Sequence, residues 1–313
     1  MPMPHLWLKY LDNIDSTLEK ADRDHDGWPE RVDYLCGEYV YFYCTVKIVL
    51  SRSDVIDIWE KISSANQDMR AHADFLTKVI DSRISNFGKW KKIVSLGTDC
   101  LPRTIATRWG LKRPRALGEL SHPFDLNISP VGALPGILSS GFAGYTDNLV
   151  YRSDLGFPVS DTHGSWFNHE HGKRWAENDF AETKFRYAKR IRSFLDALND
   201  GQPTTLVLHV SSHLDQPHFD YVLKTFEAVR SLGSNEMSFL CLATNGVSVA
   251  SSDVPNVTIA DVVRPSPDYD WSQHQHYISS GGLKFETEIV SAMESAVSGM
   301  FSEAHGVRET SHQ

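Results

Sequence analysis

Cysteine is scarce in this chain of 313 residues. The four cysteines, Cys36, Cys44, Cys100 and Cys241, include no CxxC pair. Four thiols in a chain of this length are too few for a disulfide framework, and their spacing matches no zinc site. The scarcity of cysteine therefore predicts a protein of a reducing, cytoplasmic compartment.

The sequence also lacks a long apolar run and an excess of positive charge. Its longest apolar region, residues 39–50, is interrupted by Lys47 and is too short to cross a bilayer. The N-terminus shows no basic stretch followed by an apolar core and a small-residue cleavage site, so we expect no signal peptide. The net charge is −9, whereas binding to phosphate backbones needs clustered lysine and arginine. We expect neither a membrane span nor a nucleic-acid partner.

Glycine-rich phosphate-binding motifs are absent as well. The chain contains neither a GxGxxG fingerprint nor a P-loop, so a nucleotide cofactor has no support in the sequence. Coenzyme A sites carry no short signature, and the sequence is therefore silent on coenzyme A as an acyl donor. The chemistry predicted below requires no cofactor.

The apolar residues that are present change their pattern near residue 88. Residues 1–88 show helical spacing in three stretches and predict a mostly helical N-terminal extension. From residue 89 to 305 strands alternate with helices, which predicts a three-layer α/β/α domain with a mainly parallel sheet. The strands are expected at residues 93–96, 204–210, 239–243 and 257–263. Residues 306–313 are polar, and we expect a disordered tail.

The segment Lys91–Cys100, KKIVSLGTDC, predicts a buried strand, a glycine turn and a cysteine at the start of a helix. A helix N-terminus favours negative charge, so the Cys100 thiolate would have a lowered pKa and raised reactivity there. Alternatively, Cys100 is a core residue, because free cysteine is among the most often buried residue types.

Ligands bind at the carboxyl ends of the strands in sheets of this kind. Cys100 follows the first predicted strand, Ser211 the second and Asn245 the third. Backbone N–H groups near Cys100, together with Ser211 or Asn245, could hold an oxyanion. Asp99 and Arg103 flank the cysteine and are expected at the same oxyanion or substrate site.

The stretch from Asp268 to residue 289 resembles the C-terminal end of the SGNH (GDSL-like) hydrolases. In those enzymes an Asp and a His precede a glycine and the final helix, and the nucleophile follows the first strand. The resemblance implies an SGNH-like architecture in which Asp268 or Asp270 orients His274 or His276 as the base. Here Cys100 replaces the usual serine, and Asp270 and His274 are four residues apart rather than three.

A second resemblance covers residues 93 to about 210. The run SLGTDC, an arginine-rich segment and the SHPFD sequence at 121–125 are similar to a bacterial family labelled as papain-like cysteine peptidases. Those chains also share a histidine that precedes a basic helix, which is here His169 or His171. The label implies a thiol nucleophile. His169 and His171 are therefore further alternative partners for Cys100. HxH alone is a weak metal signal, and the two histidines could instead line a substrate loop or the surface.

The SHPFD sequence allows two interpretations. His122 and Asp125 are alternative partners for Cys100. Alternatively the segment is structural, with Phe124 buried and Asp125 accepting backbone N–H bonds.

An acidic motif in the N-terminal region reads DxDxDGxxExxD. Calcium loops need oxygen ligands at alternate positions and a glycine for the sharp turn. The candidate ligands are Asp22, Asp24, Asp26, Glu30 and Asp33. The sequence predicts either a structural calcium site or an acidic, solvated turn.

These observations predict a hydrolase or acyltransferase with a cysteine nucleophile. It would act on an ester, thioester or amide of a small molecule, peptide or glycan through a covalent acyl-enzyme. Two alternatives use the same crevice: a non-catalytic ligand-binding protein, and a transferase of surface-glycan or natural-product assembly. The sequence does not indicate an oligomeric state.

Overall fold

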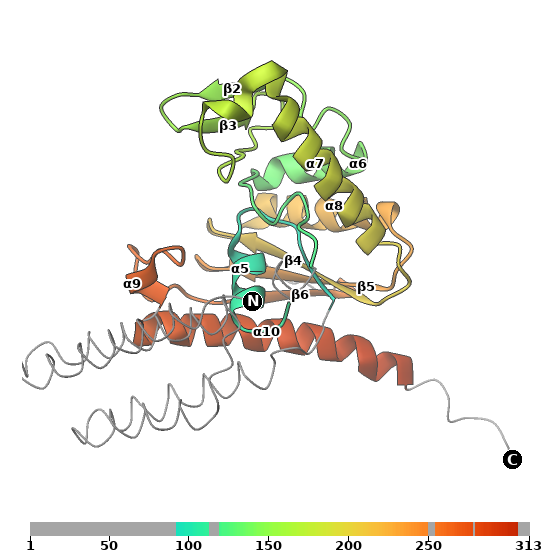
Figure 1. Ribbon diagram of the computed structural model, residues 1–313. Coiled ribbons are helices and arrows are strands. Elements are labelled where there is room, and N and C mark those ends of the chain that lie inside the picture. Colours follow the sequence, from blue (N-terminus) through green and yellow to red (C-terminus); the bar gives the residue numbers. More distant parts are fainter. Residues whose placement is uncertain (1–91, 113–118, 250–253, 278, 306–313) are drawn as a thin grey trace, which may run out of the picture. The chain divides into compact units, whose positions relative to one another are not determined.

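The computed structural model describes residues 92–112, 119–249, 254–277 and 279–305 (Figure 1). The predicted N-terminal extension, the acidic motif and the predicted tail lie outside these residues. The described residues belong to two compact units. The smaller unit includes residues 108–110, 265–277 and 279–287, and the larger unit contains the rest.

The larger unit is built on a four-stranded sheet of order β1–β4–β5–β6, in which every pair of neighbours is parallel. The strands are β1 (Ile93–Ser95), β4 (Thr204–Val210), β5 (Met237–Ala243) and β6 (Val257–Asp261). Leu206 of β4 lies beside Val94 on one side and Phe239 on the other. The predicted α/β class with a mainly parallel sheet is confirmed.

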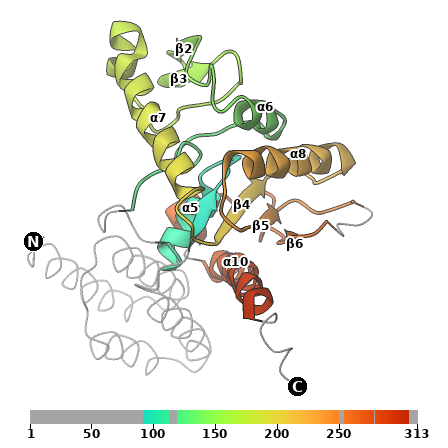
Figure 2. The ribbon, with the colours of Figure 1, turned by 90° about the vertical axis from the view of Figure 1, so that its right-hand side faces the viewer.

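Both faces of this sheet are covered. All seven residues of β4 are buried, as expected for a strand with helices on both sides. Figure 2 shows α8 (Gln216–Leu232) over one face and α10 (Ser280–His305), whose residues from 288 belong to the larger unit, over the other. The α8 helix begins where the Asp215 carboxylate accepts the His218 N–H at 3.0 Å.

A long insertion between β1 and β4 carries most of the remaining elements. The sequence did not predict its antiparallel hairpin of β2 (Leu149–Arg152) with β3 (Phe157–Ser160), which forms a second sheet. In chain order the insertion contains α5 (Leu101–Arg108), η3 (Val131–Ala133), α6 (Leu134–Ser139), β2 (Leu149–Arg152), β3 (Phe157–Ser160), η4 (Lys173–Ala176) and α7 (Glu177–Ala197). None of the helices among the described residues is long and apolar enough to cross a membrane.

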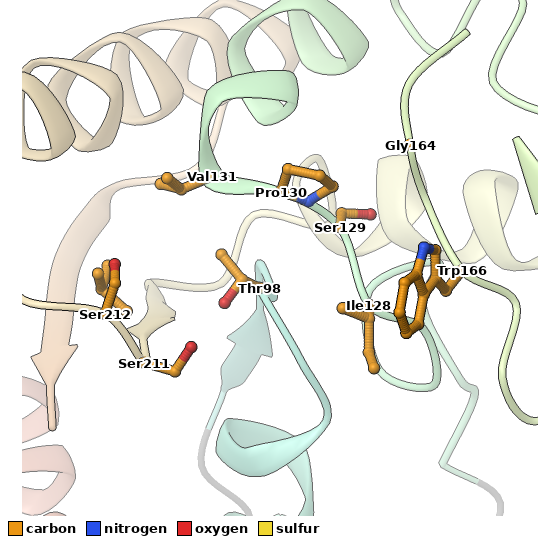
Figure 3. A pocket seen from close by; sticks show the side chains of 10 residues that line it. Thr98, Ile128, Ser129, Pro130, Val131, Gly164, Trp166, Ser211 and Ser212 are labelled. Carbon is orange, nitrogen blue, oxygen red and sulfur yellow. The ribbon is translucent and has the colours of Figure 1, made fainter. Parts of the chain in front are cut away.

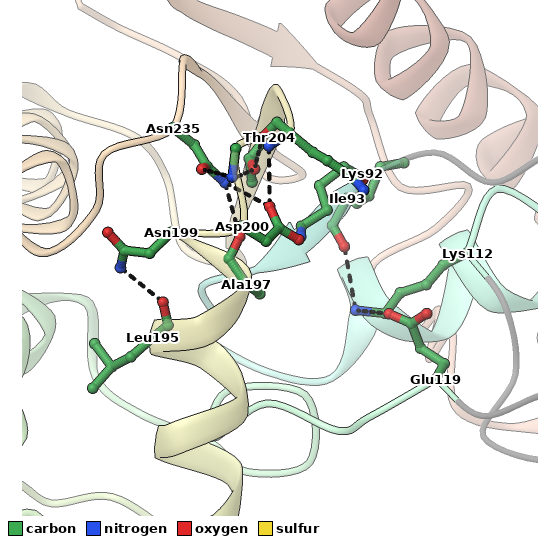
Figure 4. A network of polar contacts seen from close by, with 12 residues as sticks. Lys92, Ile93, Lys112, Glu119, Leu195, Ala197, Asn199, Asp200, Thr204 and Asn235 are labelled. Carbon is green, nitrogen blue, oxygen red and sulfur yellow. Dashed lines mark hydrogen bonds and ion pairs between the residues drawn. The ribbon is translucent and has the colours of Figure 1, made fainter.

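The amino ends of the strands are held by a set of side-chain amides, which we call the amino-end network (Figure 4). Asn235 Nδ2 donates to Ala197 O at 3.0 Å and to Thr204 Oγ1 at 3.1 Å, and Asn235 Oδ1 accepts the Gly201 N–H at 2.9 Å. Asn199 Nδ2 donates to two carbonyl oxygens, and its Oδ1 accepts a backbone N–H. The network ties the end of α7 to the starts of β4 and β5.

Candidate functional site

Cys100 lies against one histidine of the larger unit. Its Sγ is 3.3 Å from His169 Nε2, within reach of a hydrogen bond to sulfur. Cys100 immediately precedes α5 and is only 6% exposed, whereas the His169 side chain lies at the surface. The imidazole therefore stands between the sulfur and solvent.

The turn that presents Cys100 is anchored to β4 by backbone and side-chain bonds. Gly97 has a φ of +93°, a conformation that L side chains rarely adopt, and it ends the strand. The N–H and Oγ1 of Thr98 both donate to His209 O, at 3.1 and 2.9 Å. His209 N–H donates to Gly97 O at 2.7 Å. These bonds fix the backbone two residues before the sulfur.

His209 also joins three strand ends through its side chain. Its Nδ1 lies 2.9 Å from Asp99 Oδ1, and its Nε2 lies 2.9 Å from Thr244 Oγ1. Asp99 Oδ1 further accepts the Leu101 N–H at 3.0 Å, which caps the start of α5. The predicted oxyanion residue Asp99 is thus engaged in holding the turn. His209 was not among the residues predicted from the sequence, where its signal is a single imidazole in the otherwise apolar strand end LVLHV.

A buried ion-pair cluster supports the loop of His169. The Glu170 carboxylate is fully buried, forms an ion pair with Arg190 Nη1 at 3.2 Å and accepts a hydrogen bond from Arg186 Nη1 at 3.4 Å. Burial raises the pKa of Glu170, while the two guanidinium groups act in the opposite direction. The basic helix α7 thereby anchors the residue next to His169. His171 points elsewhere, with its ring edge on Phe157 at 5.5 Å between centroids.

The charge state of the Cys100–His169 pair differs from the sequence prediction. Burial raises the pKa of the Cys100 thiol to about 12, and Asp99 and Asp125 add to this, whereas Arg103 and Arg190 oppose it. Burial also lowers the pKa of His169, with Arg190 and Arg103 as further causes. The predicted low-pKa thiolate is therefore wrong, because loss of solvent outweighs the favourable helix N-terminus. At neutral pH a neutral thiol faces a neutral imidazole.

His122 and Asp125 have structural positions. Burial lowers the pKa of His122 to about 3, and its ring packs edge-on against Phe194 with centroids 6.0 Å apart. Asp125 Oδ2 accepts the His122 N–H at 2.8 Å, and Phe124 is fully buried. The structure thus shows the structural alternative for the SHPFD segment, and neither residue is the imidazole or carboxylate partner of Cys100.

Asp268, Asp270, His274 and His276 all belong to the smaller unit, whereas the contact of Cys100 with His169 forms within the larger one. The Asp270 carboxylate accepts from Ser272 N at 2.9 Å and from Ser272 Oγ at 2.7 Å. His276 Nδ1 instead accepts the backbone N–H of Asp270 at 2.8 Å. The expected orientation of His276 by the Asp270 carboxylate is therefore wrong, because a local Asx turn occupies the carboxylate. The side chain of His274 lies outside the described ones.

A pocket of about 280 Å³ opens at the carboxyl ends of β1 and β4 (Figure 3). It is lined by Thr98, Ile128, Ser129, Pro130, Val131, Gly164, Trp166, Val210, Ser211 and Ser212. Of the predicted oxyanion or substrate residues, Ser211 is therefore at a cavity. Asn245 is exposed and offers its backbone oxygen to His213 Nδ1 at 3.1 Å, and Arg103 Nε lies 4.0 Å from Asp125 Oδ2.

The part of the chain that the structure describes contains no group of three or more His, Cys, Asp or Glu residues that could hold a metal ion. The predicted calcium loop lies outside that part. Cys100 and Cys241 are both free thiols, and both are buried.

Comparisons of the chain with protein-family models, with curated proteins and with solved structures find no match. The two family resemblances of the sequence therefore stay predictions. The function of the site has to be inferred from its geometry and its charges.

Proposed function

We propose that this protein is a hydrolase or acyltransferase in which Cys100 is the nucleophile and His169 is the general base. The observation that carries the proposal is the distance of 3.3 Å between Cys100 Sγ and His169 Nε2. A nucleophile within hydrogen-bond reach of a base is the arrangement that covalent catalysis by cysteine requires. The free state of both thiols also supports the reducing, cytoplasmic location expected from the sequence.

The neutral pair defines the order of proton transfers. As the sulfur attacks a substrate carbonyl carbon, His169 Nε2 takes the thiol proton, and the carbonyl oxygen gains negative charge. When the tetrahedral intermediate collapses, the imidazolium returns that proton to the leaving oxygen, sulfur or nitrogen, and a thioester on Cys100 remains. Attack by water completes hydrolysis, and attack by another acceptor completes transfer.

The surroundings of Cys100 supply charge stabilisation for these steps. The guanidinium groups of Arg103 and Arg190 act on the sulfur in the direction that favours thiolate. No acceptor for the backbone N–H of Cys100 is found within the described residues. Because this N–H stands at the start of α5, we assign it as a donor to the developing oxyanion.

Detection of the acyl-enzyme tests the proposal. The protein is mixed with p-nitrophenyl acetate, quenched in acid, and analysed by intact mass and peptide mapping. We expect one acetyl group on Cys100 and none in the Cys100→Ala variant. Cys241→Ala is the matched control, because burial also raises the pKa of Cys241 to about 12 and it lies in the core. Equal acetylation of wild type and Cys100→Ala would contradict the proposal.

One observation favours a second candidate function, a non-catalytic ligand-binding protein. A thiol that is 6% exposed and has a pKa of about 12 behaves as a small core side chain at neutral pH. In that case ligands would bind at the carboxyl ends of the strands without any acyl-enzyme. Saturable binding of a neutral ligand, combined with no acetylation of Cys100 by any ester, would favour this second function.

A further inference from the structure

We infer that the pocket of about 280 Å³ binds the acyl group of the substrate, and that this group is short, apolar and uncharged. This inference rests on the proposed function, because the acyl group is the part of the substrate that stays on Cys100 after the scissile bond breaks.

The lining of the pocket selects an apolar and uncharged group. Ile128, Pro130, Val131 and Trp166 present hydrocarbon or ring surface, and Figure 3 shows their side chains bordering the hollow. Val210 adds further apolar surface, Gly164 has no side chain, the other four residues carry hydroxyl groups, and no charged side chain is among the ten. Two of these hydroxyls already have partners, because Thr98 Oγ1 donates to His209 O and Ser129 Oγ lies 2.9 Å from Ser165 Oγ. A buried charge without a partner would be costly, so a charged acyl group does not fit.

The segments that form the pocket also carry the reactive pair. Thr98 lines the pocket two residues before Cys100, and its carbonyl accepts the Ser129 N–H at 2.8 Å. Ile128 and Trp166 exchange two backbone hydrogen bonds, at 3.0 and 2.7 Å. Trp166 in turn precedes His169 by three residues. Thr98, Ile128 and Trp166, whose segments are hydrogen-bonded to one another, therefore line the pocket. Cys100 and His169 follow two and three residues later in the same segments.

The size of the cavity limits the length of the acyl group. A volume of about 280 Å³ is at the lower end of cavities that bind small molecules. Each methylene that becomes buried there should raise kcat/KM by up to about fourfold, which corresponds to about 0.8 kcal/mol per methylene. We therefore expect a rising preference from acetate to hexanoate and no further gain for chains too long for the pocket.

A series of p-nitrophenyl esters from acetate to decanoate tests the assignment. Wild type should favour hexanoate over acetate by more than tenfold in kcat/KM. Ser211→Leu extends a side chain into the pocket from an exposed position, so it should lower the hexanoate-to-acetate ratio by more than tenfold. Trp166→Ala enlarges the pocket and should move the optimum to a longer ester. Ser234→Leu, an exposed serine outside the pocket, is the matched control and should leave the ratio unchanged.

A binding measurement separates this inference from the proposed chemistry. Hexanamide, a neutral probe, is titrated into the full-length Cys100→Ala protein by calorimetry, and again after Ser211→Leu is added. Binding that the added leucine weakens supports the pocket assignment, whether or not Cys100 forms an acyl-enzyme. The pocket assignment would be overturned by three results together. These are an acyl-enzyme on Cys100, no binding of hexanamide, and a hexanoate-to-acetate ratio of kcat/KM that is unchanged in Ser211→Leu.

Discussion

The polar side chains at the two ends of the parallel sheet differ in whether their hydrogen-bonding atoms have partners. At the amino end, both amide atoms of Asn199 and of Asn235 have partners, and these bonds tie three elements together (Figure 4). Near Cys100 and His169 in the larger unit, Asn127 Oδ1, Asn168 Oδ1 and Glu170 Oε2 are buried and have no hydrogen-bond partner among the residues that the structure describes. At the amino end, hydrogen bonds within the fold alone satisfy the amide atoms of both asparagines.

The difference has an energetic meaning. A buried polar atom without a hydrogen bond costs about 1–3 kcal/mol, so native structures keep few of them. Their concentration around Cys100 and His169 marks a place where the fold leaves hydrogen-bonding capacity unused. We expect water or substrate to use it, whereas substitutions in the amino-end network should act on stability only.

Among the substitutions that test this comparison, removal of the proposed base, His169, should have the largest effect. His169→Ala should lower kcat/KM for p-nitrophenyl esters by about 100- to 10,000-fold, because the neutral thiol then has no proton acceptor. Steady-state kinetics measure the loss, and urea unfolding checks that the fold persists.

His171→Ala is the control for His169→Ala, since His171 lies two residues away with its ring edge on Phe157. We expect a change of less than about twofold in kcat/KM for this variant, because the ring takes no part in proton transfer. Equal losses in the two variants would assign the histidines to a common structural role.

The next effect contrasts one asparagine from each end of the sheet. Asn235→Ala should lower the free energy of unfolding by about 1–3 kcal/mol, because several partners of its amide lose a bond. Asn168→Ala should not lower it, because the substitution removes a buried Oδ1 that has no hydrogen-bond partner among the described residues and relieves its cost. Urea denaturation of both variants measures the difference, and a reversed order would contradict the contrast between the two ends.

The smallest expected effect concerns the pH at which kcat/KM falls on the acid side of its pH profile. His169 acts as a base only when neutral, and burial lowers its pKa, so the midpoint of the acid limb in kcat/KM should lie below pH 6.5. The fall should approach about tenfold per pH unit. An acid limb with its midpoint at or above pH 6.5 would show that the imidazole of His169 does not have the lowered pKa described.

The sequence alone predicted the sheet well. The strand at 204–210 has the predicted bounds, and β1 and β6 are shorter than expected by one and two residues at their ends. Continuous apolar runs of this kind are typical of parallel strands buried on both faces. The hairpin of β2 and β3 was missed, because its strands are only four residues long and β2 has two exposed residues.

The candidate site could be predicted only in part. Cys100 was identified because a strand, a glycine turn and a helix are local features of the chain. The choice of His169 among several histidines depends on how the insertion folds back over the turn, which no local pattern contains. The raised pKa of Cys100 was missed for the same reason, since its main cause is burial by residues distant in sequence.

Because the pKa of Cys100 is about 12, its thiol is protonated and unreactive at neutral pH. Peroxide and general alkylating agents react with thiolate, so they should modify resting Cys100 slowly at neutral pH. A survey of reactive cysteines with iodoacetamide would therefore overlook this residue. Under the proposed function, a substrate that brings its carbonyl to the sulfur while His169 takes the proton would reveal Cys100, and the protonated resting thiol would be protected from oxidation between turnovers.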